Sequence, residues 1–263
     1  MIVIGEKINA TRKRIQSALA ERDAEAIAAV ARQQDQAGAD YIDVNGGDPG
    51  EGKEVANMDW LMDVVQEATS KPVAVDTANP DAARVGLSKA KGKAILNSIS
   101  LESDRLNRLL PLVGEFDCRV VALLMSDGGT PSGVEDRLEA AKTLLGHLTD
   151  AGKNLDEIIV DPCVLPVSAD PASGARLMEA IAKIADNWPE VHIGGGLSNV
   201  SFGLPQRRWA NLAALSQAIA AGMDYAILDP CAEGVMEIIH AAEAVAGRDE
   251  FCMNYVTFMR DRS

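Results

Sequence analysis

Histidine, aromatic residues and clustered cysteines are scarce in this chain. Its 263 residues include 3 histidines, 4 cysteines and 4% aromatic residues. The cysteines lie far apart and form neither a CxxC pair nor a spaced group with histidine, which are the usual ligand patterns of a zinc site. We therefore expect no bound metal. Reduced thiols are typical of cytoplasmic proteins, and the cytoplasm is the location that we expect.

Basic residues are also few, and no long apolar run occurs. The chain has 25 Lys and Arg against 39 Asp and Glu, which gives a net charge of −14. Such a surface repels phosphate backbones and anionic lipid head groups, so neither nucleic acid nor a membrane is an expected partner. No apolar segment approaches the roughly 20 residues that span a bilayer, and the first residues lack the basic leader of a signal peptide.

The chain does contain a regular alternation of two patterns. Short β-type runs recur, and the stretches between them, such as residues 15–38, have helical spacing. Each interval is long enough for a helix to return the chain, which favours a parallel sheet. The β-type runs lie at residues 1–4, 41–44, 73–75, 94–96, 119–124, 157–160, 191–193 and 225–228.

Eight such runs, each followed by a helical stretch, predict an α/β fold, namely a single (β/α)8 TIM barrel. Asn79 and Pro80 have the pattern of a helix start, and Gly92 has that of a helix end. No linker or low-complexity segment divides the chain, so we expect one domain over residues 1–263. A doubly wound open sheet is the alternative that this pattern leaves open.

Polar side chains follow most of the predicted strands. Because the carboxyl ends of barrel strands meet at one mouth, we expect these side chains to lie together. They are carboxylates and carboxamides with almost no cations, and glycines accompany them at 46–47 and 194–196. Such a mouth suits a flat, neutral heterocycle with N–H donors, and glycine lets the backbone lie close to a flat ring. The residues are Glu6, Asn9, Asp43, Asn45, Asp76, Asn97, Asp161, Ser198 and Asn199.

Six segments together resemble the pterin-binding barrel family. This family includes dihydropteroate synthase, the folate module of cobalamin-dependent methionine synthase, and stand-alone methyltetrahydrofolate:corrinoid protein methyltransferases. The resemblance covers essentially the whole chain, and the spacing is most similar to that of the stand-alone methyltransferases. The segments are GEKINATR (5–12), DVNGG (43–47), VDTANP (75–80), ILNS (95–98), VDP (160–162) and GLSNVS (196–201).

The resemblance implies a reaction and its partners. A methyl group would move, in either direction, between nitrogen-5 of tetrahydrofolate and the cobalt of a corrinoid (cobalamin) that a partner corrinoid protein carries. Asp76, Asn97 and Asp161 would hold the pyrimidine edge of the pterin. The family also implies a homodimer, and the apolar and aromatic tail at residues 251–262 fits a subunit contact.

The resemblance also implies which residues lie along the rest of the substrate. Asn199 would reach nitrogen-5, which carries the methyl group. Gly196 and Ser198 would line the face of the ring. Arg207 and Arg208 would meet the aminobenzoyl-glutamate tail.

A neutral amide suits the departure of a methyl group from a tertiary amine. Nitrogen-5 gains positive character in the transition state, which a lysine in place of Asn199 would oppose. The amide of Asn199 can accept a hydrogen bond from the protonated nitrogen and rotate to suit the neutral ground state, so the contact is stronger in the transition state. We expect the proton to arrive from water through Asp76 and Asp161, and these two residues and Asn199 are the predicted catalytic residues.

Two alternatives remain at this point. Dihydropteroate synthase uses the same barrel and pterin edge, but it needs cations for a pyrophosphate leaving group. Resembling enzymes carry a lysine and an S-R-[KR] stretch after the seventh strand, where this chain has S-N-V at 198–200. The other alternative is a non-catalytic protein that binds a pterin and presents it to a complex.

Overall fold

The computed structural model describes residues 1–47 and 52–262 and has the predicted alternation of strands and helices. Within these residues eight parallel strands form one sheet in the order β7-β6-β5-β4-β3-β2-β1-β8. The strands are β1 (Ile2–Asn9), β2 (Tyr41–Asn45), β3 (Val73–Asp76), β4 (Ile95–Leu101), β5 (Arg119–Ser126), β6 (Ile158–Asp161), β7 (His192–Ile193) and β8 (Tyr225–Leu228).

The sheet closes between its two ends, β7 and β8. The backbone amide of Asp224 donates to the carbonyl of Ile193 at 3.0 Å, and the amide of Ile227 donates to the carbonyl of Gly195 at 3.1 Å. These bonds join the short strand β7 to β8, so the molecule is a (β/α)8 barrel. The predicted TIM barrel is confirmed, and the open-sheet alternative is wrong.

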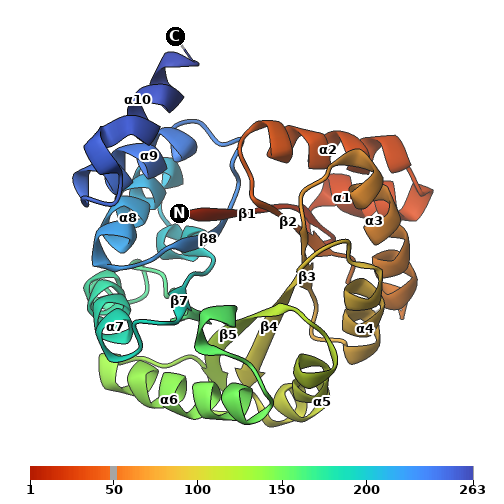
Figure 1. Ribbon diagram of the computed structural model, residues 1–263, viewed down its shortest axis with the longest axis horizontal. Helices are drawn as coiled ribbons and strands as arrows, with labels where there is room; N and C mark the ends of the chain where they lie inside the picture. The colour runs from red at the N-terminus through yellow and green to blue at the C-terminus, as the bar shows by residue number, and fades with distance from the viewer. Residues whose placement is uncertain (48–51, 263) are drawn as a thin grey trace.

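Helices form a ring outside the strands (Figure 1). The elements follow one another clockwise in this view, and because parallel crossovers are right-handed, the reader looks at the amino ends of the strands. The helices are α1 (Lys13–Glu21), α2 (Ala24–Gln36), α3 (Glu54–Ala68), α4 (Pro80–Lys89), α5 (Ser103–Glu115), α6 (Val134–Asp150), α7 (Ser173–Asn187), α8 (Arg207–Ala221), α9 (Val235–Val245) and α10 (Met253–Arg260), with short 3-10 turns η1 (Leu155–Glu157), η2 (Leu197–Ser201) and η3 (Glu250–Cys252).

Side-chain caps explain where two of the helices begin. Asn79 accepts a hydrogen bond from the amide of Asp81 at 3.0 Å, so α4 starts where the sequence predicts, and it ends shortly before Gly92. The stretch 15–38 forms two helices rather than one. Arg22 adopts a left-handed conformation with φ 53, and Asp23 then caps α2 by accepting from the amide of Ala26 at 3.0 Å.

The barrel interior is filled by apolar side chains below the mouth. One buried layer takes a residue from each of six strands, and a larger apolar cluster fills the space between the strands and the helices. The interior layer separates the mouth from the amino end of the barrel, so the mouth opens on the carboxyl side. Its residues are Ile4, Ala74, Ile95, Val121, Ile159 and Tyr225.

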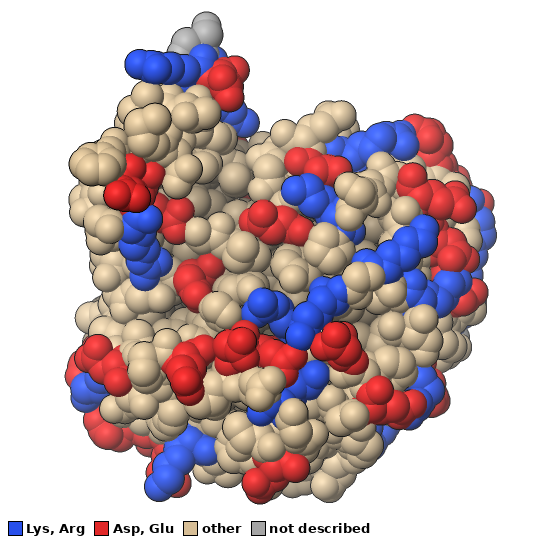
Figure 2. All heavy atoms as spheres, in the orientation of Figure 1, with Lys and Arg blue, Asp and Glu red and all other residues tan. Residues whose placement is uncertain are grey.

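Charges at the amino ends of the strands are paired on the surface. Lys93, for example, contacts Asp117 at 3.0 Å and also pairs with Glu157. Figure 2 shows this face, with basic and acidic side chains next to each other around its middle. Over the part of the chain that the structure describes, no helix is both long enough and apolar enough to cross a bilayer.

Candidate functional site

The neighbouring strands β2, β3 and β4 bring four polar side chains into one hydrogen-bonded group. Asp76 is the register partner of Asn97 on the neighbouring strand. The Asn97 amide donates to Asp43 at 3.1 Å, and the Asn45 amide donates to Asp76 at 2.9 Å. We call these four residues the acid–amide well. The sequence predicted each of them from its place near the end of a predicted strand. The structure continues β4 to Leu101, so Asn97 lies within that strand, and all four side chains are nevertheless brought together.

The two carboxyl groups of the well also contact each other. Burial raises the pKa of Asp43 well above its ordinary value, and the adjacent charge of Asp76 raises it further. Burial raises the pKa of Asp76 as well, whereas the hydrogen bond from Asn45 and the charge of Arg105 lower it. A hydrogen bond joins the two side chains, so a proton held on Asp43 points to an ionised Asp76. Contact between two carboxyl groups therefore opposes the ionisation of both at once.

Arg105, on α5, is a cation that the sequence analysis missed. Its guanidinium donates to the carbonyl and the hydroxyl of Ser98, each at 3.0 Å, and its charge acts on Asp76. The residue is separated from β4 by a turn and has no motif of its own, so only the packing of α5 against the strand places it here. The expectation of a mouth almost without cations is wrong at this position.

Asp161 lies at the end of β6, beyond β5 from the well. Its carboxylate accepts a hydrogen bond from the amide of Cys163 at 2.9 Å and another from the amide of Gly196. Burial is the main cause that raises the pKa of Asp161 to about 6, and the charge of Arg137 acts in the opposite direction. At neutral pH the group is mostly ionised and can accept hydrogen bonds from a ligand.

The glycines after β7 allow different contacts at each position. A Cβ on Gly194 would lie 2.5 Å from the Tyr225 Cβ, and one on Gly195 would lie 2.5 Å from an Asp161 carboxylate oxygen. Both are therefore required by the packing of the chain itself. A Cβ on Gly196 would meet nothing within 4 Å. Of the three, Gly196 is the one that faces open space, as a residue lining a ring would.

Asn199 stands at the surface of the turn η2. Leu197 and Val200 on either side of it are buried, which anchors the turn, whereas Asn199 itself is exposed. Its carboxamide makes no hydrogen bond to any residue that the structure describes. The backbone at Asn199 is therefore anchored, whereas its side chain remains available to bond a ligand.

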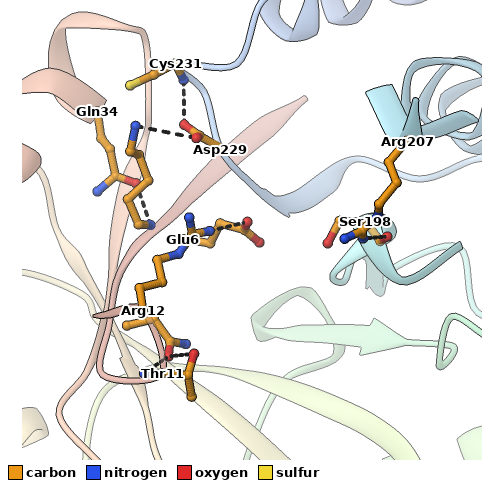
Figure 3. A network of polar contacts seen from close by, with 10 residues as sticks. Glu6, Thr11, Arg12, Gln34, Ser198, Arg207, Asp229 and Cys231 are labelled. Carbon is orange, nitrogen blue, oxygen red and sulfur yellow. Dashed lines mark hydrogen bonds and ion pairs between the residues drawn. The ribbon is translucent and has the colours of Figure 1, made fainter. Parts of the chain in front are cut away.

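Arg207, the first residue of α8, holds the turn η2 by hydrogen bonds. Its guanidinium donates to the carbonyl of Ser198 at 2.6 Å and to the hydroxyl of Ser201 at 2.9 Å, and it stacks on the ring of Phe202. Figure 3 shows Arg207 reaching from α8 to Ser198. Arg208 instead pairs with Glu233 at 2.6 Å on the outer surface. The two adjacent arginines thus have different environments, although the sequence suggested one role for both.

The end of β1 contributes charged side chains from the other side of the mouth. A register shift between Gly5 and Ile8 inserts an extra residue in β1, and the buried Gln34 accepts a hydrogen bond from the amide of Lys7 at 2.9 Å. This bulge directs Glu6 toward the Ser198 side of the mouth (Figure 3). A Cβ on Gly5 would lie 2.6 Å from the Gln34 oxygen, so the glycine permits this contact.

Two further cations lie along this edge. Arg12 donates to Glu6 at 2.8 Å, and Lys7 lies 3.4 Å from Asp229. Burial raises the pKa of Glu6, which the charge of Arg12 partly offsets. Asn9, predicted as a substrate contact, accepts hydrogen bonds from the amide and hydroxyl of Thr11 and shapes the loop after β1. Lys7 and Arg12 are thus each paired with a carboxylate of this edge. Among residues 1–47 and 52–262 no group of three His, Cys, Asp or Glu side chains has the geometry for a metal ion.

A comparison with family models decides the relationship. The model described as pterin binding enzyme matches residues 5–229, which include every strand end described above. The chain belongs to the pterin-binding enzyme family. The resemblance read from the six sequence segments is confirmed.

Two groups of relatives are similar in sequence. The methylcorrinoid:tetrahydrofolate methyltransferase of Eubacterium limosum is 34% identical over 257 residues, which cover 97% of this chain and 94% of that protein. The methionine synthases of Mycobacterium leprae and Mycobacterium tuberculosis are 27% identical over 248 residues, which cover 87% of this chain and 20% of theirs. The chain thus spans a fifth of the length of these methionine synthases.

Solved structures show the same fold at low sequence identity. The dihydropteroate synthase of Xanthomonas albilineans in complex with 7,8-dihydropteroate has a TM-score of 0.70 at 18% identity and covers 93% of this chain and 92% of that one. The dihydropteroate synthase of Coxiella burnetii with pteroic acid has a TM-score of 0.69 at 18% identity, covering 93% of each chain. At this identity the likeness concerns the barrel alone.

Proposed function

We propose that this chain, as one barrel over residues 1–263, transfers a methyl group between nitrogen-5 of tetrahydrofolate and the cobalt of a corrinoid carried by a partner protein. The observation that carries the proposal is the combination of the hydrogen-bonded acid–amide well, which is buried at Asp43 and Asn97, with an exposed amide at Asn199 that makes no hydrogen bond to the described residues. The methyltransferase of Eubacterium limosum, similar over nearly the full chain, supports the same reaction.

The residues present fit the pyrimidine edge of a pterin. That edge offers N–H donors, and Asp76, Asn97 and Asp161 offer carboxylate and amide oxygens at the strand ends. Asp76 accepts a hydrogen bond from Asn45, and Asp43 accepts one from Asn97. Because one carboxylate can accept several hydrogen bonds, each can still accept others from a ligand. The open space above Gly196 leaves room for the ring.

The chemistry then depends on Asn199 and on a proton. When the methyl group leaves nitrogen-5, the amide of Asn199 accepts a hydrogen bond from the protonated nitrogen, and in the neutral ground state it rotates to donate. A contact that strengthens in the transition state is worth roughly 2–4 kcal/mol. We expect the proton to arrive from water through Asp76 and Asp161, and the raised pKa of Asp43 beside Asp76 favours a carboxyl group that can hold a proton within the mouth.

Access from outside is required because the other reactant is bound to a protein. Phe202 directly follows the turn that carries Asn199, Trp209 lies in the first turn of α8, and both are exposed. Aromatic residues and arginine are enriched at protein interfaces. A corrinoid protein that brings its cofactor to nitrogen-5 would cover this surface.

The test follows cobalt absorbance in both directions. The purified chain is mixed with tetrahydrofolate and methylcobalamin, and separately with methyltetrahydrofolate and cob(I)alamin. We expect enzyme-dependent methyl transfer in both, because both directions share one transition state; the name of the Eubacterium limosum relative gives methylcorrinoid to tetrahydrofolate as the direction. Binding of folate without turnover in either mixture would instead support the non-catalytic alternative.

The dihydropteroate synthase alternative has less support. The basic S-R-[KR] stretch of that enzyme corresponds to residues 198–200 here, where its two cations are replaced by Asn199 and Val200. The side chain of Val200 is buried. The same preparation, given a pterin pyrophosphate and 4-aminobenzoate, is expected to form no dihydropteroate.

We further propose that the chain works as a homodimer in the cytoplasm. The apolar side chain of Phe251, in η3 before α10, is 86% exposed, and those of Val245 and Met253 nearby are also exposed. All four cysteines are free, which fits a reducing compartment. Sedimentation of the wild-type chain and of Phe251→Ser tests the homodimer. We expect a dimeric wild type and a weaker dimer in Phe251→Ser, and a monomeric wild type would refute the homodimer.

A further inference from the structure

Arg137, on α6, is a fully buried cation that no part of the proposed reaction uses. Its exposed fraction is 0%, and it is the largest of the fully buried side chains. Within the described residues no carboxylate lies at ion-pair distance from it. Burying a charge without a partner ion is unfavourable, so its presence under the mouth calls for a specific contact.

The guanidinium directs its hydrogen bonds to the backbone that follows Asp161. Nε donates to the carbonyl of Pro162 at 2.6 Å, and Nη2 donates to the carbonyl of Cys163 at 3.1 Å. Nη1 donates to the carbonyl of Gly133, at the start of its own helix, at 3.0 Å. Arg137 therefore ties the start of α6 to the end of β6.

The backbone that it holds has an unfavourable conformation. Cys163 has φ 60, in the left-handed region that side chains other than glycine rarely adopt. Its carbonyl is bonded to Arg137, and its amide donates to the Asp161 carboxylate at 2.9 Å. One turn thus receives hydrogen bonds from the arginine on one side and gives one to the carboxylate on the other.

We propose that Arg137 is a positioning residue for folate: its hydrogen bonds hold the turn at residues 161–163, and it thereby aims the Asp161 carboxylate at the pterin edge. This inference rests on the proposed function and names the residue that prepares one of its contacts. It explains why an arginine is buried at a place where an apolar side chain would pack without the cost of desolvating a charge.

The electrostatic surroundings agree with this assignment. Burial raises the pKa of Asp161 to about 6, and the charge of Arg137 is the nearby ionic influence that lowers it. The other charged groups that act on Arg137 are Asp136 on its own helix and Arg176 on α7, while the Cys163 thiol lies on the shared turn. Without the guanidinium charge, and with the turn that donates to Asp161 no longer held, the pKa of Asp161 should rise.

The experiment measures the titration of Asp161 first without any ligand. The 13C resonance of its carboxyl carbon, identified by its loss in Asp161→Asn, is followed from pH 4 to 9. The variants are Arg137→Gln and Arg137→Met, which remove the charge, and Arg137→Lys, which keeps it. Arg108→Gln, an exposed arginine on α5 paired with Asp104, is the control. We expect a higher midpoint in both neutral variants and a nearly unchanged one in Arg137→Lys and the control.

The same proteins are then titrated with methyltetrahydrofolate over the same pH range. For a shift of about one unit, the affinity of the neutral variants at pH 6 falls about fivefold relative to wild type and returns to the wild-type value near pH 9. Arg137→Met serves if Arg137→Gln does not fold, since an apolar replacement of a buried ion is often tolerated. An unchanged Asp161 midpoint in a folded neutral variant would overturn the proposal. Failure of wild type to bind methyltetrahydrofolate at any pH would instead refute the proposed function.

Discussion

The two sides of the mouth, the acid–amide well and the turn η2, solve different problems. In the well, Asp43 and Asn97 are buried, Asn45 and Asp76 are half-buried, and the four side chains hydrogen-bond one another before any ligand arrives. On η2, Asn199 is exposed and unbonded, while the turn beneath it is anchored by buried side chains and by Arg207. The well is built to recognise a constant edge of the substrate. The turn holds a group that must change its partner during the reaction.

This difference has a physical basis. A buried carboxylate discriminates strongly because a ligand that lacks the matching N–H leaves it unpaired. Catalysis needs a contact that differs between ground and transition state, and a group already committed to an internal hydrogen bond cannot provide it. Variants on the two sides should therefore separate binding from turnover.

The largest effect is expected for Asn199→Ala. The rate of methyl transfer should fall by about one to three decades, since one hydrogen bond made in the transition state is lost. The affinity for methyltetrahydrofolate should stay within about twofold, because Asn199 is not part of the well. Stopped-flow absorbance of cob(I)alamin and a fluorescence titration measure the two quantities. Asn187→Ala, at the end of α7 and exposed, is the matched control. Equal rates in both variants would remove Asn199 from the mechanism.

Asp161→Asn should show the opposite pattern. Loss of a charged acceptor should weaken folate binding by about one to two decades. The pH dependence should change as well. The pKa of Asp161 is raised to about 6, so wild-type affinity should be full above that pH and decline as the carboxylate is protonated below it. The amide that replaces the carboxylate does not titrate, so in the variant this acid limb should vanish. Persistence of the limb in a calorimetric pH series would assign it to another group, such as the Asp43–Asp76 pair.

A smaller effect is expected for Arg207→Gln. The variant loses the bonds to Ser198 and Ser201 that hold η2, so Asn199 should move and the rate should fall about tenfold, below the ~100-fold that a 1 Å displacement can cost. Arg208→Gln, beside it but paired with Glu233, should change the rate less than twofold. A methyltetrahydropterin without the aminobenzoyl-glutamate tail tests the other role: if Arg207 binds the tail, the loss should disappear with this substrate.

The smallest effect is expected for Trp209→Ala. The KM for the corrinoid protein should rise about fivefold, which corresponds to the ~1 kcal/mol of a contributing interface side chain. The rate with free cobalamin should not change, because no protein surface is then involved. Equal effects on both acceptors would show that Trp209 acts on the barrel rather than on docking.

Much of the site follows from the sequence because barrel geometry is repetitive. Once the strands are located by their apolar runs, every residue at a strand end is placed at the mouth, and Asp43, Asp76, Asn97 and Asp161 are found without any tertiary information. The same reasoning cannot find Arg105 or Arg137, because neither follows a strand. Each reaches the mouth from a helix, through contacts that depend on how the helix packs.

The amino-acid order was enough to establish the barrel, the acids and amides at its mouth, and Asn199 as a neutral group after the seventh strand. These features depend on local periodicity and on position along each strand, both of which are properties of the chain itself. Three other features depend on distances between segments that lie far apart in sequence. They are the contact between Asp43 and Asp76, the different partners of Arg207 and Arg208, and the burial of Arg137 next to the turn after Asp161. Burial and neighbouring charge determine ionisation, and these exist only once the chain is folded.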